Sequence, residues 1–278
     1  IHSAGGTLLN QLKQHRLHTD LTEKGTLFFH TKTSWMMWNS LVSALSIGAQ
    51  IVLYDGDPLA REGKMLFDLA EKKKITVFGT SAGFLSEIEK KGLHPRETHN
   101  LSSIRTILST GSRLFGAQFD YVYEHVHPTV QLASTSGGTE IMGAWATASP
   151  VHPVRREELQ TRSLGYKVEV FDEEGSPLPP GVRGELVCTA PFPSQPLGFW
   201  NDPEHERYLK TYFEKYGPTV WCHGDEAELT PSGGIVIHVR SDDTLKRGGV
   251  RMGAGEICAQ VVKIPEVRAA AVIGQKIE

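Results

Sequence analysis

The densest group of residues that could do chemistry is the stretch from Ser134 to Glu140, which reads STSGGTE. Hydroxyls and backbone amides in such a turn can bind phosphate oxygens, and Gly137 and Gly138 let the backbone approach a ligand closely. A carboxylate such as Glu140 could hold a hard cation such as Mg²⁺ through oxygen. The stretch therefore indicates a nucleotide site, although a plain turn after a strand is the alternative.

Two further polar clusters lie closer to the end of the chain. His223-Gly224-Asp225 follows an apolar pair, and an aspartate at a strand-end turn can accept two hydrogen bonds from a ribose diol. The segment from Arg240 to Arg251 places arginines on either side of Asp242-Asp243 and a Gly-Gly pair. Arginine forks match phosphate and diol oxygens. A turn aspartate and a solvated charged linker are the plain alternatives for the two clusters.

The segment Trp35-Met36-Met37-Trp38 is aromatic and polarisable. It could line an acyl pocket, although residues at this helical spacing more often belong to a core. The histidines are scattered without metal-ligand spacing, so no zinc site is predicted.

The elements that must position these residues alternate between strand and helix through about residue 134. Strands are expected at 27–29, 51–54, 75–78, 104–108 and 130–132, with amphipathic helices between them. This order predicts an α/β fold with a parallel sheet that helices cover on both faces. Ligands of such sheets bind beyond the carboxyl ends of the strands. Two loops leave there, Ser109 to Ser112 and Ser134 to Glu140.

The second half of the chain has a different texture. Alternating apolar residues at 165–171 and 184–188, and a hairpin around Pro231-Ser232-Gly233, predict antiparallel β structure. We therefore expect three parts: an α/β parallel-sheet subdomain over 1–134, a small antiparallel β subdomain over 135–241, and the start of an α+β C-terminal lid domain over 242–278.

Composition narrows the possible partners. The formal net charge of -3 gives no basic excess, which argues against nucleic acid or an anionic membrane surface. No apolar run approaches the roughly 18 to 20 residues of a membrane span. Three cysteines without metal spacing fit a reducing compartment, so we expect a cytoplasmic protein with small-molecule substrates. The chain opens as though in mid-domain, and we expect it to be a fragment truncated at both ends.

Together, these clusters resemble the acyl-adenylate-forming superfamily of acyl-CoA synthetases, and within it the branch that activates acetoacetate. The resemblance spans essentially the whole chain. Its motifs are HSAGG at 2–6, WMMWN at 35–39, STSGGTE at 134–140, GEL at 184–186, LGFWND at 197–202, VWCHGDEAELTPSGG at 220–234 and RSDDTLKRGGVR at 240–251. It implies a ligase that uses ATP, Mg²⁺ and coenzyme A. A carboxylate attacks the α-phosphate to give an acyl-adenylate and pyrophosphate, and the CoA thiol then displaces AMP.

The resemblance also implies roles for residues at the phosphates. Gly137 and Gly138 match the backbone beside the adenylate, and Thr139 matches the hydroxyl that contacts phosphate. Glu140 matches the carboxylate that holds Mg²⁺, and Arg251 matches the contact to the α-phosphate. A guanidinium and a cation at this point would stabilise the charge that develops during attack.

The remaining implied roles lie away from the phosphates. Asp225 matches the ligand of the ribose diol, with Arg240 assisting. Asp242 matches the hinge about which a C-terminal lid domain rotates between the two half-reactions. Trp35 matches the aromatic residue near the acyl site.

The chain departs from the superfamily pattern in several places. The phosphate loop of the superfamily is expected upstream of Ile1 and its catalytic lysine beyond Glu278, because Lys246 does not match that lysine. Cys222 stands where an arginine is usual. Two alternatives stay open: a CoA ligase for another short acid such as acetate, propionate or butyrate, and a non-catalytic nucleotide-binding fragment. We expect the 278 residues alone to bind adenylate weakly and not to turn over.

Overall fold

The computed structural model describes residues 1–241, 244–247, 250–262, 264 and 266–272. The chain forms two compact units. The first contains Ile1–Tyr166, Pro191–His205 and Gly233–Ile235, and the second contains Lys167–Ala190, Glu206–Ser232 and the chain from Val236 on. The three-part division at residues 134/135 and 241/242 stays a prediction.

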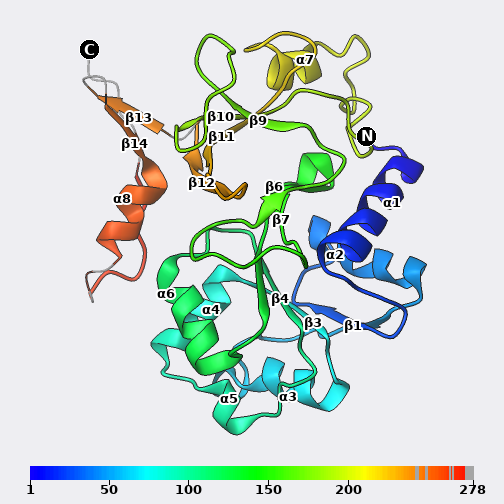
Figure 1. The fold of residues 1–278 in the computed structure, drawn as a ribbon, viewed down its shortest axis with the longest axis vertical. Helices are drawn as coiled ribbons and strands as arrows, with labels where there is room; N and C mark the ends of the chain where they lie inside the picture. The colour runs from blue at the N-terminus through cyan, green and yellow to red at the C-terminus, as the bar shows by residue number, and fades with distance from the viewer. Residues whose placement is uncertain (242–243, 248–249, 263, 265, 273–278) are drawn as a thin grey trace. The chain divides into compact units, whose positions relative to one another are not determined.

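A five-stranded sheet forms the centre of the first unit (Figure 1). Its order is β2-β1-β3-β4-β5, and every neighbouring pair is parallel. The strands are β1 (Thr26–Phe29), β2 (Gln50–Val52), β3 (Val77–Ser81), β4 (Thr106–Thr110) and β5 (Gln131–Ser134). The predicted parallel α/β fold is therefore confirmed.

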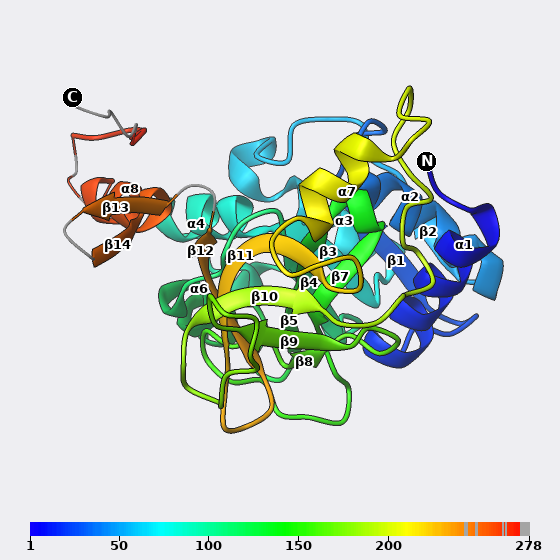
Figure 2. The same cartoon turned by 90° about the horizontal axis from the view of Figure 1, so that it is seen from above.

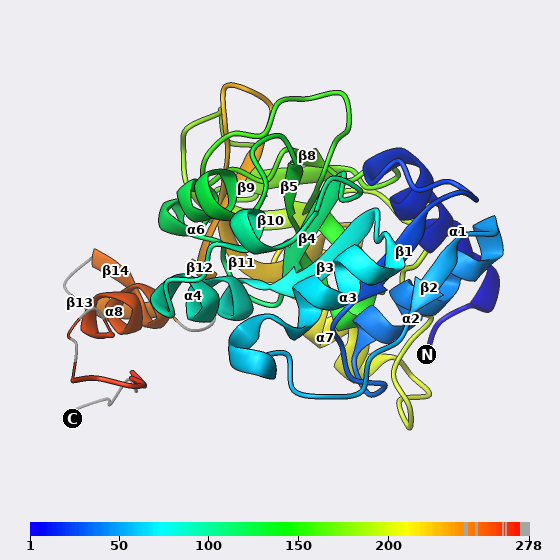
Figure 3. The ribbon, with the colours of Figure 1, turned by 90° about the horizontal axis from the view of Figure 1, so that it is seen from below.

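Helices cover both faces of this sheet. The helices α3 (Met65–Lys73), α4 (Ala82–Lys90) and α6 (Gly116–Tyr121) share one apolar cluster with the sheet, and Figure 3 shows them together. The helices α1 (Ala4–Lys13) and α2 (Met36–Ser43) accompany the opposite face. Shorter helical segments are η1 (Gln14–His18), η2 (Ala44–Ile47), η3 (Arg61–Gly63), α5 (Pro95–Thr98) and η4 (Val122–Val126). Gly48 ends η2 at φ 78°, which is the left-handed cap that its residue type favours.

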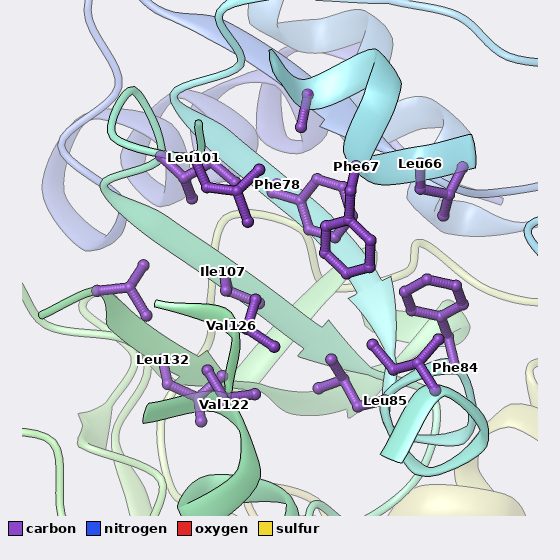
Figure 4. Packing of buried hydrophobic residues seen from close by; sticks show 14 of the residues in the cluster. Leu66, Phe67, Phe78, Phe84, Leu85, Leu101, Ile107, Val122, Val126 and Leu132 are labelled. Carbon is purple, nitrogen blue, oxygen red and sulfur yellow. The ribbon is translucent and has the colours of Figure 1, made fainter. Parts of the chain in front are cut away.

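Strand alternation sends neighbouring side chains to opposite faces. In β1, Phe28 joins the core beneath α3, α4 and α6, whereas Leu27 and Phe29 join the core beneath α2. Figure 4 shows the first core, where the rings of Phe67 and Phe78 stack at 5.8 Å between centroids. Both faces of the strands are thus apolar, so the polar groups of the sheet gather at its strand ends.

A three-stranded antiparallel sheet follows β5 within the first unit. It contains β6 (Ser136–Gly138), β7 (Gly143–Thr147) and β8 (Thr161–Arg162), and a 3₁₀ turn, η5 (Thr139–Ile141), connects β6 to β7. The stretch at 134–140 was predicted as a turn, but half of it is a strand end and a short paired strand. Sequence periodicity misses a strand this short because three small residues carry no apolar alternation.

The second unit is built mainly of antiparallel β structure, as predicted. Its sheet has the order β12-β11-β10-β9, and Figure 2 shows β9, β10 and β11 side by side. The strands are β9 (Val168–Phe171), β10 (Gly184–Cys188), β11 (Trp221–Leu229) and β12 (Ile235–Arg240). The unit also holds α7 (Glu206–Phe213), the hairpin β13 (Thr244–Arg247) and β14 (Val250–Gly253), and α8 (Ala254–Val261). Among the residues that the structure describes, no helix has the length and apolar character that a membrane crossing requires.

Candidate functional site

The two loops predicted at the carboxyl edge of the parallel sheet lie next to each other. Ser109 at the end of β4 pairs in register with Ser134 at the end of β5. The amide of Thr135 donates to the carbonyl of Ser109 at 2.9 Å, and the hydroxyl of Thr110 donates to the carbonyl of Thr135 at 2.9 Å. These bonds fix the start of the STSGGTE stretch at the edge where ligands of parallel sheets bind.

The two glycines of the stretch are required for different reasons. A Cβ on Gly137 would overlap the carbonyl oxygen of Gly143, so the close pairing of β6 with β7 needs a glycine. A Cβ on Gly138 would instead overlap the carboxylate of Glu140, which folds back over this residue. Gly137 thus serves the backbone, and Gly138 makes room for one carboxylate.

Glu140 offers oxygen ligands of the kind that Mg²⁺ takes. Its residue is half-buried, whereas Thr139 beside it is exposed. Within the described part of the chain, no cluster of three or more His, Cys, Asp or Glu side chains could hold a metal ion by itself. Mg²⁺ commonly uses one or two carboxylates together with substrate phosphates. A single carboxylate beside a hydroxyl therefore fits a cation that arrives with a nucleotide.

Trp35 lies against the same edge of the first unit. A Cβ on Gly111 would be 3.4 Å from the Trp35 ring, and the ring is 6.2 Å from that of Phe29, between centroids. A cavity of about 70 Å³ opens nearby. Its lining includes Phe29, Met36, Met37, Leu41, Leu108 and Thr135. The WMMWN segment therefore contributes both to core packing and to a small apolar cavity.

In the second unit, the predicted ribose residues contact each other. Asp225 is buried on β11, and its Oδ1 lies 3.3 Å from Nη1 of Arg240 on β12. The same Nη1 donates to the carbonyl of His223 at 3.3 Å. Gly224 takes φ 84°, and a Cβ there would be 3.1 Å from the Arg240 guanidinium. The glycine lets the arginine come close enough to orient the carboxylate.

Glu185, the carboxylate of the GEL motif, is a polar residue of this unit that sequence reasoning did not single out. It is buried, its Oε2 accepts from Lys215 Nζ at 2.8 Å, and its Oε1 accepts from the Ser241 hydroxyl at 2.9 Å. Burial and the charge of Glu185 raise the pKa of the neighbouring Cys222 thiol to about 12. Cys222 is therefore a neutral thiol, and Lys215 supplies the positive charge beside Glu185.

Two predicted residues have limited structural description. Arg251 lies in β14, where its backbone pairs with Lys246 of β13. Asp242, the predicted hinge, lies outside the described residues.

The sequence also contains a G-x-S-x-G pattern, from Gly79 to Gly83, where β3 meets α4. This pattern can mark a strained nucleophile elbow. Ser81 instead keeps an extended backbone, with φ -116° and ψ 156°, and its hydroxyl accepts a hydrogen bond from the Phe84 amide. Ser81 is therefore a helix cap.

Comparison with known proteins agrees with this arrangement. The family described as "AMP-binding enzyme" matches residues 1–195. The chain belongs to the AMP-binding enzyme family. It is 51% identical over 275 residues to an acetoacetyl-coenzyme A synthetase of Rhizobium meliloti, covering 99% of this chain and 42% of that protein. It is 48% identical over 268 residues to acetoacetyl-CoA synthetase of Rattus norvegicus, covering 96% of this chain and 40% of that protein.

A solved structure from this family has the same fold. Acetoacetyl-CoA synthetase from Streptomyces lividans superposes with a TM-score of 0.91 at 43% identity, covering 98% of this chain and 42% of that one. The resemblance read from the motifs is thus confirmed. The chain spans about two fifths of the length of the relatives it matches.

Further AMP-binding-domain residues near Glu140 escaped sequence reasoning. Asn10 and Gln11 are buried, although they sit in a helix chosen for its leucines. Two adjacent amides at buried helix positions were the available signal, since buried polar side chains need specific partners.

Proposed function

We propose that the full-length protein, meaning the longest natural chain that contains these residues, activates acetoacetate with ATP and transfers the acyl group to coenzyme A. The observation that carries the proposal is the Glu140 carboxylate folded over Gly138 at the carboxyl edge of the sheet. High identity to relatives named acetoacetyl-CoA synthetases supports the choice of acid.

In the first step, an oxygen of the acetoacetate carboxylate attacks the α-phosphorus of ATP. The bond from that phosphorus to the bridging oxygen breaks, and pyrophosphate leaves. Thr139 donates its hydroxyl to a phosphate oxygen, the glycine backbone at 137–138 lies beside the adenylate, and Arg251 pairs with the α-phosphate. Glu140 holds Mg²⁺. When bound, Mg²⁺ would offset the negative charge on the phosphates.

Asp225 accepts hydrogen bonds from the two ribose hydroxyls of ATP. Arg240 supports this role by holding one carboxylate oxygen, at 3.3 Å. Since the carboxylate is buried and already oriented, little conformational entropy is lost when ribose binds.

In the second step, the CoA thiol attacks the acyl carbon. The bond between that carbon and the AMP oxygen breaks, and the thiol proton passes to solvent. Rotation about the hinge at Asp242 would let one site run both steps. The apolar cavity lined by Met36 and Met37, next to Trp35, takes the short carbon chain of the acid.

The deciding experiment measures pyrophosphate release by the full-length protein with acetoacetate, acetate, propionate and butyrate. We expect the highest kcat/KM with acetoacetate and no release without an acid. Glu140→Gln, which keeps the size of the side chain, should lower release strongly, whereas Glu23→Gln, an exposed control, should not. A higher kcat/KM with another acid would make the protein a ligase for that acid. Absence of acid-dependent release would contradict the proposal altogether.

A further inference from the structure

The backbone just after Glu140 is held in an unfavourable conformation. Met142 takes φ 48° and ψ 40°, in the left-handed region. A residue with a side chain pays roughly 1–2 kcal/mol to stay there, so such a conformation persists only where surrounding contacts enforce it. The enforcing contacts come from far away in the sequence.

Two buried amides hold the Met142 carbonyl. Nδ2 of Asn10 donates to it at 2.9 Å and Nε2 of Gln11 donates to it at 2.7 Å. Both residues lie on α1, and they are 1% and 2% exposed. One carbonyl oxygen has two lone pairs, so these two donors saturate it.

The preceding carbonyl is held as well. The hydroxyl of Ser194 donates to the carbonyl of Ile141, and Ser194 is itself 1% exposed. The Tyr166 hydroxyl lies 2.8 Å from the Ser194 oxygen and can donate to it. The amide of Met142 also donates to the carbonyl of Thr139 at 3.2 Å, which closes the turn around Glu140.

These contacts constrain the carboxylate from both sides. Before Glu140, Gly138 is paired to β7. After it, three side-chain donors fix the two carbonyls at 141 and 142, and the Ile141 side chain is fully buried. A loosened turn would let the carboxylate shift away from Gly138 without unfolding either sheet.

We propose that Asn10, Gln11 and Ser194 are positioning residues that fix the Glu140 carboxylate where it meets the cation carried by ATP. This inference rests on the proposed function, because it requires Glu140 to bind that cation. The three side chains touch neither nucleotide nor metal in this account. They act only through the backbone at 141 and 142.

The test compares two glutamines of one helical segment. Gln11→Met removes a donor to Met142 and preserves side-chain length. Gln14→Met makes the same change three residues on, where the amide donates to the Ser163 hydroxyl at 3.0 Å instead. For each full-length protein, titration calorimetry gives the Kd of ATP in Mg²⁺ and in EDTA. The ratio of the two Kd values measures how much the cation helps, and a loss of general stability leaves this ratio unchanged.

Gln11→Met should lower this ratio about fivefold, which corresponds to one lost hydrogen bond. Gln14→Met should leave the ratio as in the wild type. An unchanged ratio in Gln11→Met, or an equal fall in Gln14→Met, would overturn the inference. If Gln11→Met does not fold, Ser194→Ala decides in the same way. A wild-type protein whose ATP affinity ignores Mg²⁺ would refute the cation role of Glu140, and this inference with it. Acid-dependent pyrophosphate release reports on the proposed function separately.

Discussion

The two neighbouring glycines of the STSGGTE stretch should respond differently to alanine. Gly138 has φ -139° and ψ 154°, an extended conformation that alanine adopts without strain. The new Cβ would overlap only the end of the Glu140 side chain, which can rotate away. Gly138→Ala should therefore change the free energy of unfolding by no more than about 1 kcal/mol.

The same substitution should damage ATP binding. Rotation of the Glu140 carboxylate away from Gly138 would remove a contact between a charged group and the cation. Contacts of this kind contribute about 1.5–3 kcal/mol, so ATP affinity in Mg²⁺ should fall by about tenfold to a hundredfold. Affinity in EDTA should stay close to that of the wild type. Calorimetric titration of the full-length protein measures both values.

Gly137→Ala provides the matched control. Its Cβ would meet the carbonyl of Gly143 and the Cα of Ala144, which are backbone atoms and cannot rotate away. The cost of overpacking is about 1–3 kcal/mol, visible as a lower Tm. If Gly138→Ala kept the Mg²⁺-dependent affinity within about twofold, while Gly137→Ala behaved as expected, the assignment of Glu140 would be refuted. Equal loss of Tm in both variants would refute the structural reasoning about Gly138.

Three further outcomes are expected. Asp225→Asn should raise the KM for ATP about tenfold and narrow the preference for ATP over 2′-deoxy-ATP, and an unchanged preference would remove Asp225 from the ribose. Burial lowers the pKa of His15 and of His18 to about 4, against hydrogen bonds to Ser40 and Ala148 that raise it. The unfolded chain then binds more protons between pH 6.5 and 4, so the free energy of unfolding should fall with pH by about 3 kcal/mol for each histidine, and denaturant titrations of His15→Gln should show a shallower fall. Met37→Ala should enlarge the apolar cavity and favour butyrate over acetoacetate about fourfold, as one buried CH₂ group would; an unchanged ratio of kcat/KM would place the acyl chain elsewhere.

Local patterns predicted most of the parallel half of the fold. The run Leu27-Phe28-Phe29 is apolar on every residue, which is typical of a strand buried on both faces, and both faces are indeed covered. Gly184–Cys188 and the hairpin near Pro231 were equally legible. The short strand β6 was not, because its pairing depends on the absence of a side chain at Gly137 and on no pattern of side chains.

The candidate site divides in the same way. Glu140, Asp225 and Arg240 were predicted because each belongs to a compact motif of polar residues and glycines. Asn10 escaped because its partner, the Met142 carbonyl, lies 132 residues away. A backbone carbonyl leaves no trace in residue types, so a single sequence cannot reveal such a contact.

The contacts of Asn10 and Gln11 bear on why a carboxylate in a surface turn could serve as a precise ligand. Turns are usually mobile, and a mobile carboxylate would have to lose conformational entropy each time it met the cation. Here the entropy is lost on folding instead, since buried amides of α1 hold the strained Met142. The unfavourable φ of Met142 is then part of the positioning, because a turn free to relax would carry Glu140 with it. Burial of the donors keeps water from competing for the carbonyl, which makes each bond harder to open.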